Sequence, residues 1–302
     1  MLGIVILNYL NWWDTVELIN SITHQSCNNY HIIIVDNNST NDSVLQLSRR
    51  YSSVSNISLL ISKDNEGFAR GNNIGIRYAR NSIHVSDVLL LNNDTLLIER
   101  EYLENLMNIS YDNSVGAIGT RILDNNNQNQ NPTYTTGSFK QALTGYMGKN
   151  KLFKIFRNFL FFFNSLINDV TKKNASKDES SAVNVDYQLN KKYFILHGSA
   201  ILLTKNYLDV YPGLYPRTFL YFEENFLDFL LHKKNLHAEY HEELTIKHKE
   251  DQSSNLVFDD IRNEKKTLLI DSWREFLKIQ FMPQKKIMKQ FLRYDSQSVK
   301  KF

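Results

Sequence analysis

The chain has 302 residues, a formal net charge of +3 and one cysteine, Cys27. This length predicts one large α/β domain or one domain with an extension. The small charge excludes nucleic acid as a required partner, and a single cysteine excludes an internal disulfide. No apolar run reaches the length of a membrane span. Residues 1–7 enter an apolar strand without a basic leader, so we expect a cytoplasmic protein without a signal peptide.

Apolar runs and helical patterns alternate along the first 120 residues. Strands are predicted at residues 3–7, 31–35, 57–61, 85–91 and 115–118. Helices are predicted at residues 14–22, 67–80 and 100–109. Strands that alternate with helices favour parallel β-α-β units. The expected fold class is therefore α/β, with a doubly wound, mostly parallel sheet.

Right-handed crossovers would bring the polar tips of the first, second and fourth strands to one edge of this sheet. Ligands of open α/β sheets bind beyond the carboxyl ends of the strands. The fourth strand ends in Asn92, Asn93 and Asp94. Because Mg²⁺ or Mn²⁺ often takes one or two protein carboxylates together with substrate phosphate oxygens, Asp94 is a candidate metal ligand. An ordinary loop aspartate is the alternative.

Two further features belong to this edge. Asp36 ends the second strand, where its carboxylate can accept a hydrogen bond from a nucleobase or a ribose hydroxyl; a turn or helix-capping role is the alternative. Glycines spaced by four at 67, 71 and 75 predict a helix close to the sheet and do not match a dinucleotide-binding fingerprint. Arg70, on the first turn, is placed to meet a diphosphate or is simply solvated.

The ordered motifs of the chain resemble those of inverting nucleotide-sugar glycosyltransferases of family 2, which have the glycosyltransferase A fold. The motifs are IVILNY (4–9), IIVDNNS (33–39), NEGFARGN (65–72), LLNNDT (90–95), HGSA (197–200) and YFEE (221–224). Within the family, the chain is most similar to the branch that includes rhamnosyltransferases and other enzymes of surface-polysaccharide assembly.

This resemblance implies that Asp36 binds the nucleotide base or ribose and that Asp94 belongs to a D-x-D-like metal motif. Asn92 replaces the first aspartate of that motif, which leaves metal dependence open. His248 matches a histidine near the metal or diphosphate, and imidazole suits Mn²⁺ better than Mg²⁺. The other implied donor-binding residues are Asn8, Asn38, Asn65, Gly67, Arg70, Asn72, Asn92 and Asn93.

Glu223 and Glu224 stand on the first turn of a predicted helix, where the helix dipole is expected to keep both ionised. An ionised carboxylate is what a general base for an acceptor hydroxyl requires. The resemblance assigns this role to Glu224. Phe226 stands where relatives commonly carry an aspartate, so Glu223 and Asp228 stay as candidates. The alternative is that the glutamates only stabilise the helix start.

The expected catalytic domain covers residues 1–255, followed by a helical C-terminal extension at 256–302. Its parts are a nucleotide-binding half (1–120), a variable insertion (121–190) and an acceptor half (191–255).

Two stretches of the insertion have distinct compositions. The Asn- and Gln-rich tract (residues 124–131) predicts a mobile loop. Residues 151–163 predict a basic amphipathic helix that either lies in a membrane interface or packs on protein. Residues 172–181 predict a linker, and the basic stretch 285–301 is expected to face a membrane or a second subunit, so a homodimer stays open.

Together these features predict sugar transfer from a nucleoside-diphosphate donor, dTDP-rhamnose or a UDP-hexose, to a glycan or polyprenyl-linked glycan. The enzyme would lie in the cytoplasm or on the inner face of the plasma membrane. One alternative is a nucleotidyltransferase, although such enzymes usually carry a Gly-rich loop where this chain has Asn8 and Tyr9. The other, given Asn92 and Phe226, is a catalytically silent sugar-nucleotide-binding or scaffold protein.

Overall fold

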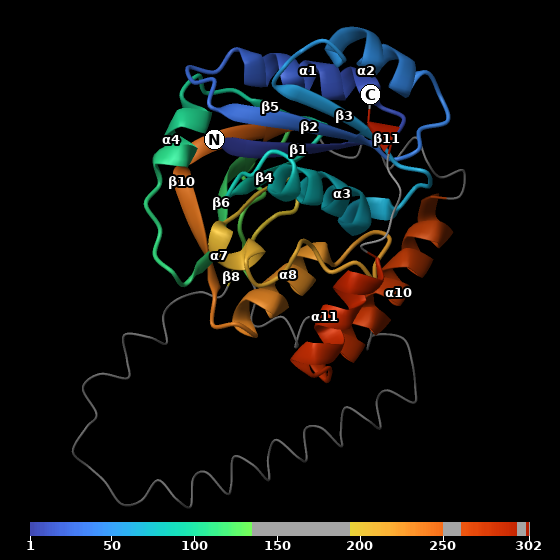
Figure 1. Ribbon diagram of the computed structural model, residues 1–302. Coiled ribbons are helices and arrows are strands. Elements are labelled where there is room, and N and C mark those ends of the chain that lie inside the picture. Colours follow the sequence, from blue (N-terminus) through green and yellow to red (C-terminus); the bar gives the residue numbers. More distant parts are fainter. Residues whose placement is uncertain (135–193, 250–260, 295–299, 302) are drawn as a thin grey trace, which may run out of the picture. The chain divides into compact units, whose positions relative to one another are not determined.

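The computed structural model describes residues 1–134, 194–249, 261–294 and 300–301. Met1–Thr133 and Ile195–Phe302 form one compact unit, and Tyr134–Phe194 form a second. The first unit holds a nine-stranded sheet with helices around it (Figure 1). The helix predicted at 151–163 and the linker predicted at 172–181 lie outside the described residues.

The N-terminal part of the chain contributes four neighbouring parallel strands. They are β3 (Ile57–Ile61), β2 (Tyr30–Asp36), β1 (Leu2–Asn8) and β4 (Val88–Asn92), in that spatial order. Each is an almost unbroken run of buried apolar residues, as expected for strands covered on both faces. The register places Asn8 beside Asp36 and Leu7 beside Asn92. The predicted meeting of these strand tips is therefore confirmed.

The rest of the sheet mixes strand directions. β9 (Ala200–Leu203) lies antiparallel between β4 and β6 (Val115–Leu123). β10 (His237–His248) runs parallel to β6, and β5 (Thr95–Leu97) pairs antiparallel with β10. The predicted α/β class is confirmed, with antiparallel pairs that the apolar runs alone did not indicate.

Helices cover both faces of the parallel strands. Those of the N-terminal part are α1 (Trp12–Thr23), α2 (Ser43–Tyr51), α3 (Gly67–Asn81) and α4 (Tyr102–Asn108). α1 and α2 lie on one face and α3 on the other (Figure 1). A Cβ built on Gly75 would lie 2.4 Å from Val5 Cγ1, and one on Gly71 2.6 Å from Leu7 Cδ1. The predicted close approach of this glycine-containing helix to the sheet is thus confirmed.

The C-terminal part contains the helix that begins with Glu223 and Glu224, and a later helix packs against it. Its helices are α7 (Lys205–Leu208), α8 (Glu223–His232), α10 (Ile261–Gln280) and α11 (Gln284–Arg293). Phe276 of α10 is fully buried, with its ring centroid 5.2 Å from that of Phe226 and 6.0 Å from that of Phe222. Within the described ranges, no helix is both long and apolar enough to cross a membrane.

Three short strands complete the structure. β11 (Lys300–Lys301) pairs antiparallel with β3 at one edge of the large sheet. β7 (Thr133–Tyr134) and β8 (Phe194–Ile195) form a separate two-stranded sheet. Residues 196–199 lie between β8 and β9.

Replacement of Phe276 tests the packing of α10. Phe276→Ala should lower the free energy of unfolding by about 3–5 kcal/mol, because it leaves a cavity among aromatic rings. Phe281 lies just beyond α10 and is 82% exposed, so Phe281→Ala should change stability little. Thermal and urea unfolding measure both effects. Equal losses for the two variants would contradict the packing described.

Candidate functional site

Asp36 lies at the end of β2 and is held from two sides. Asn8 Nδ2 donates to Asp36 Oδ2 (2.7 Å), and the Ser39 N–H donates to Oδ1 (2.8 Å). Asn8 Oδ1 in turn accepts from the Thr15 hydroxyl (2.8 Å). Burial raises the pKa of Asp36, and the hydrogen bonds from Ser39 and Asn8 partly oppose this shift. The turn role is therefore observed, while a role in ligand binding stays a prediction.

Asn37 is not among the predicted site residues, yet it joins β2 to α3. Its Nδ2 donates to Asn65 Oδ1 (2.9 Å) and Gly67 O (3.2 Å). Its Oδ1 accepts from the Glu66 N–H (2.9 Å). Two predicted donor residues, Asn65 and Gly67, are thereby fixed beside the tip of β2. The signal that could have identified Asn37 is its place directly after Asp36 in a polar strand tip.

The start of α3 lies against the segment that precedes α8. Gly67 has φ +71°, and a Cβ there would lie 2.1 Å from Phe219 O, so this position requires glycine. The Phe68 N–H donates to the same carbonyl (2.8 Å). Tyr221 and Phe222 have φ of +74° and +72°. Such conformations cost about 1–3 kcal/mol each for bulky residues and cluster at functional segments.

Three further residues predicted to bind the donor are Arg70, Asn72 and Asn38. Arg70 Nε lies 3.0 Å from Glu66 Oε2, and its guanidinium lies 5.3 Å from the centroid of the Tyr294 ring. Asn72 is buried and donates to a backbone carbonyl one turn earlier in α3 (3.0 Å). Asn38 is exposed, with φ +63°. Their proposed contacts with a donor stay predictions.

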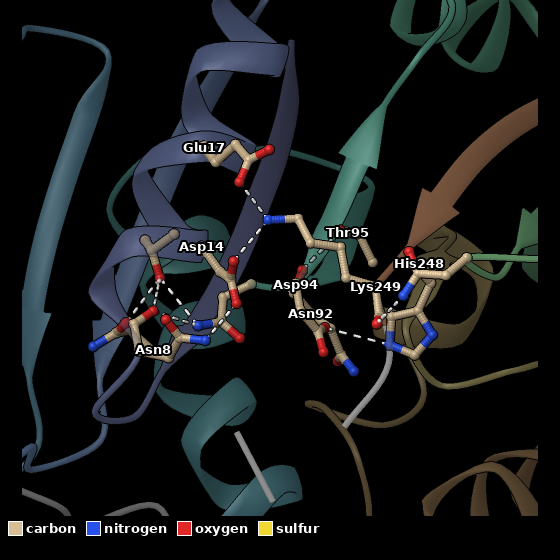
Figure 2. A network of polar contacts seen from close by, with 12 residues as sticks. Asn8, Asp14, Glu17, Asn92, Asp94, Thr95, His248 and Lys249 are labelled. Carbon is tan, nitrogen blue, oxygen red and sulfur yellow. Dashed lines mark hydrogen bonds and ion pairs between the residues drawn. The ribbon is translucent and has the colours of Figure 1, made fainter. Parts of the chain in front are cut away.

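Asp94 and His248 face each other where β4 and β10 end (Figure 2). Asp94 Oδ1 is buried and has no hydrogen-bond partner in the described part of the chain, and His248 Nε2 lies 3.3 Å from it. His248 Nδ1 lies 2.9 Å from Gln130 Oε1. An amide oxygen only accepts, so in this arrangement Nδ1 donates to Gln130 Oε1 and Nε2 is the ring nitrogen that faces Asp94.

This pair suits a divalent cation that is shared with a ligand. The described residues contain no group of three or more His, Cys, Asp or Glu side chains that could hold a metal ion. Mg²⁺ and Mn²⁺ do not require one, since they bind one or two protein groups and fill the other positions with substrate or water oxygens. The Asp94 oxygen and the imidazole nitrogen that faces it therefore fit such a cation.

The other residues of the β4 tip hold the loop in place. The Asn92 N–H donates to Ser199 O (2.8 Å). Asn93 is buried, and its Nδ2 donates to Asn11 O (2.9 Å) and lies 3.3 Å from Thr15 Oγ1. Asn93 thus anchors the tip to the start of α1, whereas Asp94 carries the carboxylate of the tip.

Lys249 ties the end of β10 to α1. Its Nζ contacts Asp14 Oδ1 at 2.7 Å and also pairs with Glu17, as Figure 2 shows. Burial lowers the pKa of Lys249, but the hydrogen bonds and charges of Asp14 and Glu17 outweigh burial and raise it. Lys249 therefore stays charged and holds the chain directly after His248 against α1.

Residues 197–199 connect Glu224 to the pair formed by Asp94 and His248. The Gly198 N–H donates to Glu224 Oε1 (3.1 Å), and a Cβ on Gly198 would lie 2.4 Å from that oxygen. The ring centroids of His197 and His248 lie 5.4 Å apart. A chain of contacts thus runs from Glu224 through Gly198 and His197 to His248 and Asp94. The structure brings the predicted base and the predicted metal ligands into one site.

Glu223 is not the ionised carboxylate that its helix position predicts. Burial, and secondly the Glu224 carboxylate, raise its pKa to about 8. The expectation of two ionised glutamates is therefore wrong for Glu223, because burial outweighs the helix dipole. The third candidate, Asp228, lies 3.3 Å from His232 and raises the pKa of that histidine to about 9. Asp228 is thus engaged along α8.

The Asn- and Gln-rich tract, for which a mobile loop is expected, is held by hydrogen bonds at several points. Asn131 is fully buried; its Nδ2 donates to Thr120 O (2.6 Å), and its Oδ1 accepts from the His197 N–H (2.8 Å). Asp124 Oδ1 accepts two backbone N–H groups of the tract, at 2.7 and 2.8 Å. Composition does not reveal these partners, some of which lie far along the chain.

Comparisons with known proteins give one family. The sequence profile of Glycosyl transferase family 2 matches residues 3–169, more than half of the chain. The low-salt glycan biosynthesis hexosyltransferase Agl10 of Haloferax volcanii is 31% identical over 134 residues, which are 44% of this chain. The match spans only 40% of the length of that relative.

Solved structures of similar fold are distant in sequence. The mannosyltransferase PcManGT from Pyrobaculum calidifontis, in complex with GDP-Man and Mn²⁺, has a TM-score of 0.52 at 12% identity, over 97% of this chain and 73% of that chain. S. aureus TarS 1–349 has a TM-score of 0.51 at 13% identity, over 97% and 71%. At these identities the likeness shows the fold alone.

The neutral state of Glu223 predicts a pH-dependent stability. Its pKa in the folded chain, about 8, exceeds the ordinary value of 4.5, so the folded state binds more protons between these values. Stability from this group is present at low pH and is lost as pH rises toward about 8. As pH rises from 4.5 to about 8, the melting temperature of the wild type should therefore fall relative to that of Glu223→Gln. Above about pH 8 the difference between the two should stay constant.

Thermal melts from about pH 5 to about pH 9 measure this difference. Glu264→Gln, at an exposed position of α10, is the matched control and should differ from the wild type by a constant amount. A constant difference for Glu223→Gln over the whole range would contradict the neutral state.

Proposed function

The chain belongs to glycosyl transferase family 2, and we propose that it transfers a sugar from a nucleoside-diphosphate donor to a glycan hydroxyl, with inversion at the anomeric carbon. The observation that carries this proposal is the pair of Asp94 and His248. A buried carboxylate oxygen without a hydrogen-bond partner in the described part of the chain faces an imidazole nitrogen at 3.3 Å, at the edge where parallel strands end. Ligands of open α/β sheets bind at that edge.

The donor nucleotide would lie at the tips of β1, β2 and β4. Asp36 would accept a hydrogen bond from the base or ribose, and Asn8 and Ser39 hold its carboxylate for that contact. Asn37 fixes Asn65 and Gly67 next to it. The donors we propose are dTDP-rhamnose or a UDP-hexose. Agl10, described as a hexosyltransferase of glycan biosynthesis, supports the hexosyl class.

Asp94 Oδ1 and His248 Nε2 would hold Mn²⁺ or Mg²⁺ together with diphosphate oxygens. When bound, the cation offsets the negative charge that develops on the leaving diphosphate. PcManGT, solved with GDP-Man and Mn²⁺, supports a cation in this fold. Asn92 is neutral, so Asp94 supplies the carboxylate of this tip.

Glu224 would act as the base for the acceptor. Gly198 holds its Oε1, and Oε2 would take the hydroxyl proton. As the acceptor oxygen bonds to the anomeric carbon opposite the diphosphate, its proton passes to Glu224. The electrons of the broken carbon–oxygen bond leave with the diphosphate. Its raised pKa, about 8, keeps Glu223 mostly protonated at neutral pH, so it is a poorer base than Glu224 there.

Glu224→Gln tests this assignment. The amide keeps an oxygen for the Gly198 N–H but cannot take a proton, so turnover should fall by about 10²–10⁴-fold. Donor affinity should change little. Sugar transfer is measured directly, and donor binding by thermal shift with a panel of nucleotide sugars, with and without Mn²⁺.

Glu264→Gln should retain wild-type turnover, since Glu264 is exposed on α10. Normal turnover of Glu224→Gln would place the base elsewhere. Donor binding by the wild type without turnover, across donors and metals, would favour a silent sugar-nucleotide-binding protein.

We further propose that the acceptor is lipid-linked and that the enzyme binds peripherally to the inner face of the plasma membrane. α11 carries exposed basic residues, and the neighbouring apolar side chains of Phe281 (82% exposed) and Leu292 (64%) are also exposed. The basic residues are Lys285, Lys286, Lys289 and Arg293. None of them forms an ion pair within the described residues, and anionic lipid contributes about 1 kcal/mol per basic residue near the surface.

Flotation with anionic vesicles tests this surface. Lys285→Glu/Lys289→Glu should reduce the recovered fraction strongly, because it reverses two charges on the outer face of α11. Lys63→Glu/Lys234→Glu makes the same charge change at exposed positions outside α11 and should float like the wild type. Equal recovery of both variants would exclude α11 as the membrane contact.

A further inference from the structure

The Asn- and Gln-rich tract contacts the candidate site at three points. Gln130 Oε1 lies 2.9 Å from His248 Nδ1. Asn125 Nδ2 donates to the backbone carbonyl of the residue after His248 (2.7 Å). Asn131 Oδ1 accepts from the His197 N–H (2.8 Å). Two side chains of one short tract therefore contact His248 and His197, and a third contacts the residue after His248.

The tract itself is fixed to β6. The Gln130 N–H donates to Ile122 O (2.8 Å), and the Ile122 N–H donates to Asn129 Oδ1 (3.2 Å). Asn131 is fully buried and bonds to Thr120 O. The side chain of Gln130 thus extends from an ordered backbone, which makes it suited to orienting a neighbouring group.

The contact with Gln130 favours a proton on Nδ1 of His248, and so an Nε2 without a proton on the side of Asp94. A neutral imidazole has one N–H, and an acceptor at Nδ1 keeps the proton there. Nε2 then presents its lone pair to Asp94 Oδ1, 3.3 Å away. With the proton on Nε2, the ring would instead donate to Asp94 and occupy the place of a cation. The choice of tautomer therefore opens or closes the site to a metal.

We propose that Gln130 is a positioning residue that orients His248 and selects the tautomer whose Nε2 binds a divalent cation together with Asp94. This inference rests on the proposed function, because it requires a cation at that pair. Partners that hold the second nitrogen of a metal-binding histidine typically change metal affinity by 10–100-fold.

The tautomer can be measured without metal. In ¹⁵N-histidine-labelled protein, with the His248 signals assigned by His248→Gln, the wild type should show a protonated Nδ1 and an unprotonated Nε2. Gln130→Met, which has similar length but no amide oxygen, should show a mixture of tautomers. Gln130→Glu keeps the acceptor and should keep the wild-type tautomer. Gln128→Met changes an exposed residue of the same tract and is the control.

Mn²⁺ affinity provides the second measurement, by titration with UDP, dTDP or GDP present. Gln130→Met should bind Mn²⁺ about 10–100-fold more weakly than the wild type, while Gln130→Glu and Gln128→Met should bind it normally. Wild-type tautomer and affinity in Gln130→Met would overturn the role of Gln130 and leave the proposed function intact. A wild type that binds neither Mn²⁺ nor Mg²⁺ with any of these nucleotides would overturn both the role of Gln130 and the proposed cation site.

Discussion

The backbone hydrogen bond from the Asn92 N–H to Ser199 O (2.8 Å) extends the antiparallel ladder of β4 and β9 beyond the first residue of β9. The candidate site depends on this extension. It brings residues 197–199 to the tip of β4, so that Gly198 can hold Glu224 and His197 can lie against His248. Because β9 lies between β4 and β6, it ties this C-terminal segment to two strands of the N-terminal part.

Burial and hydrogen bonding give neighbouring carboxyl groups different chemistry. Glu223 is buried and its pKa is raised to about 8, whereas Glu224 is half-buried and is held by a backbone N–H. Asp36 is fully buried but has both oxygens hydrogen-bonded. Asp94 is buried with one oxygen that no described residue bonds. The proposed base, nucleotide contact and metal ligand thus differ in burial and hydrogen bonding.

Much of the nucleotide-binding half follows from local sequence pattern. Continuous apolar runs locate β1 to β4, and the spacing of Gly67, Gly71 and Gly75 indicates the close approach of α3. Pairings between distant segments do not follow in this way. β5 has three residues, too few for a periodic pattern, and the partners of Gln130 and Asn131 lie elsewhere along the chain. The neutral charge of Glu223 depends on packing that no local pattern contains.

The sheet ends at both sides in very short strands, β11 with two residues and β5 with three. An open strand edge offers unpaired N–H and C=O groups to other chains and is a common origin of aggregation. Here the long edges of β3 and β10 are each partly covered by a short strand. The two residues of β11 are both lysines, which disfavour the approach of a further strand. The fold therefore limits intermolecular β-pairing at both edges of the sheet.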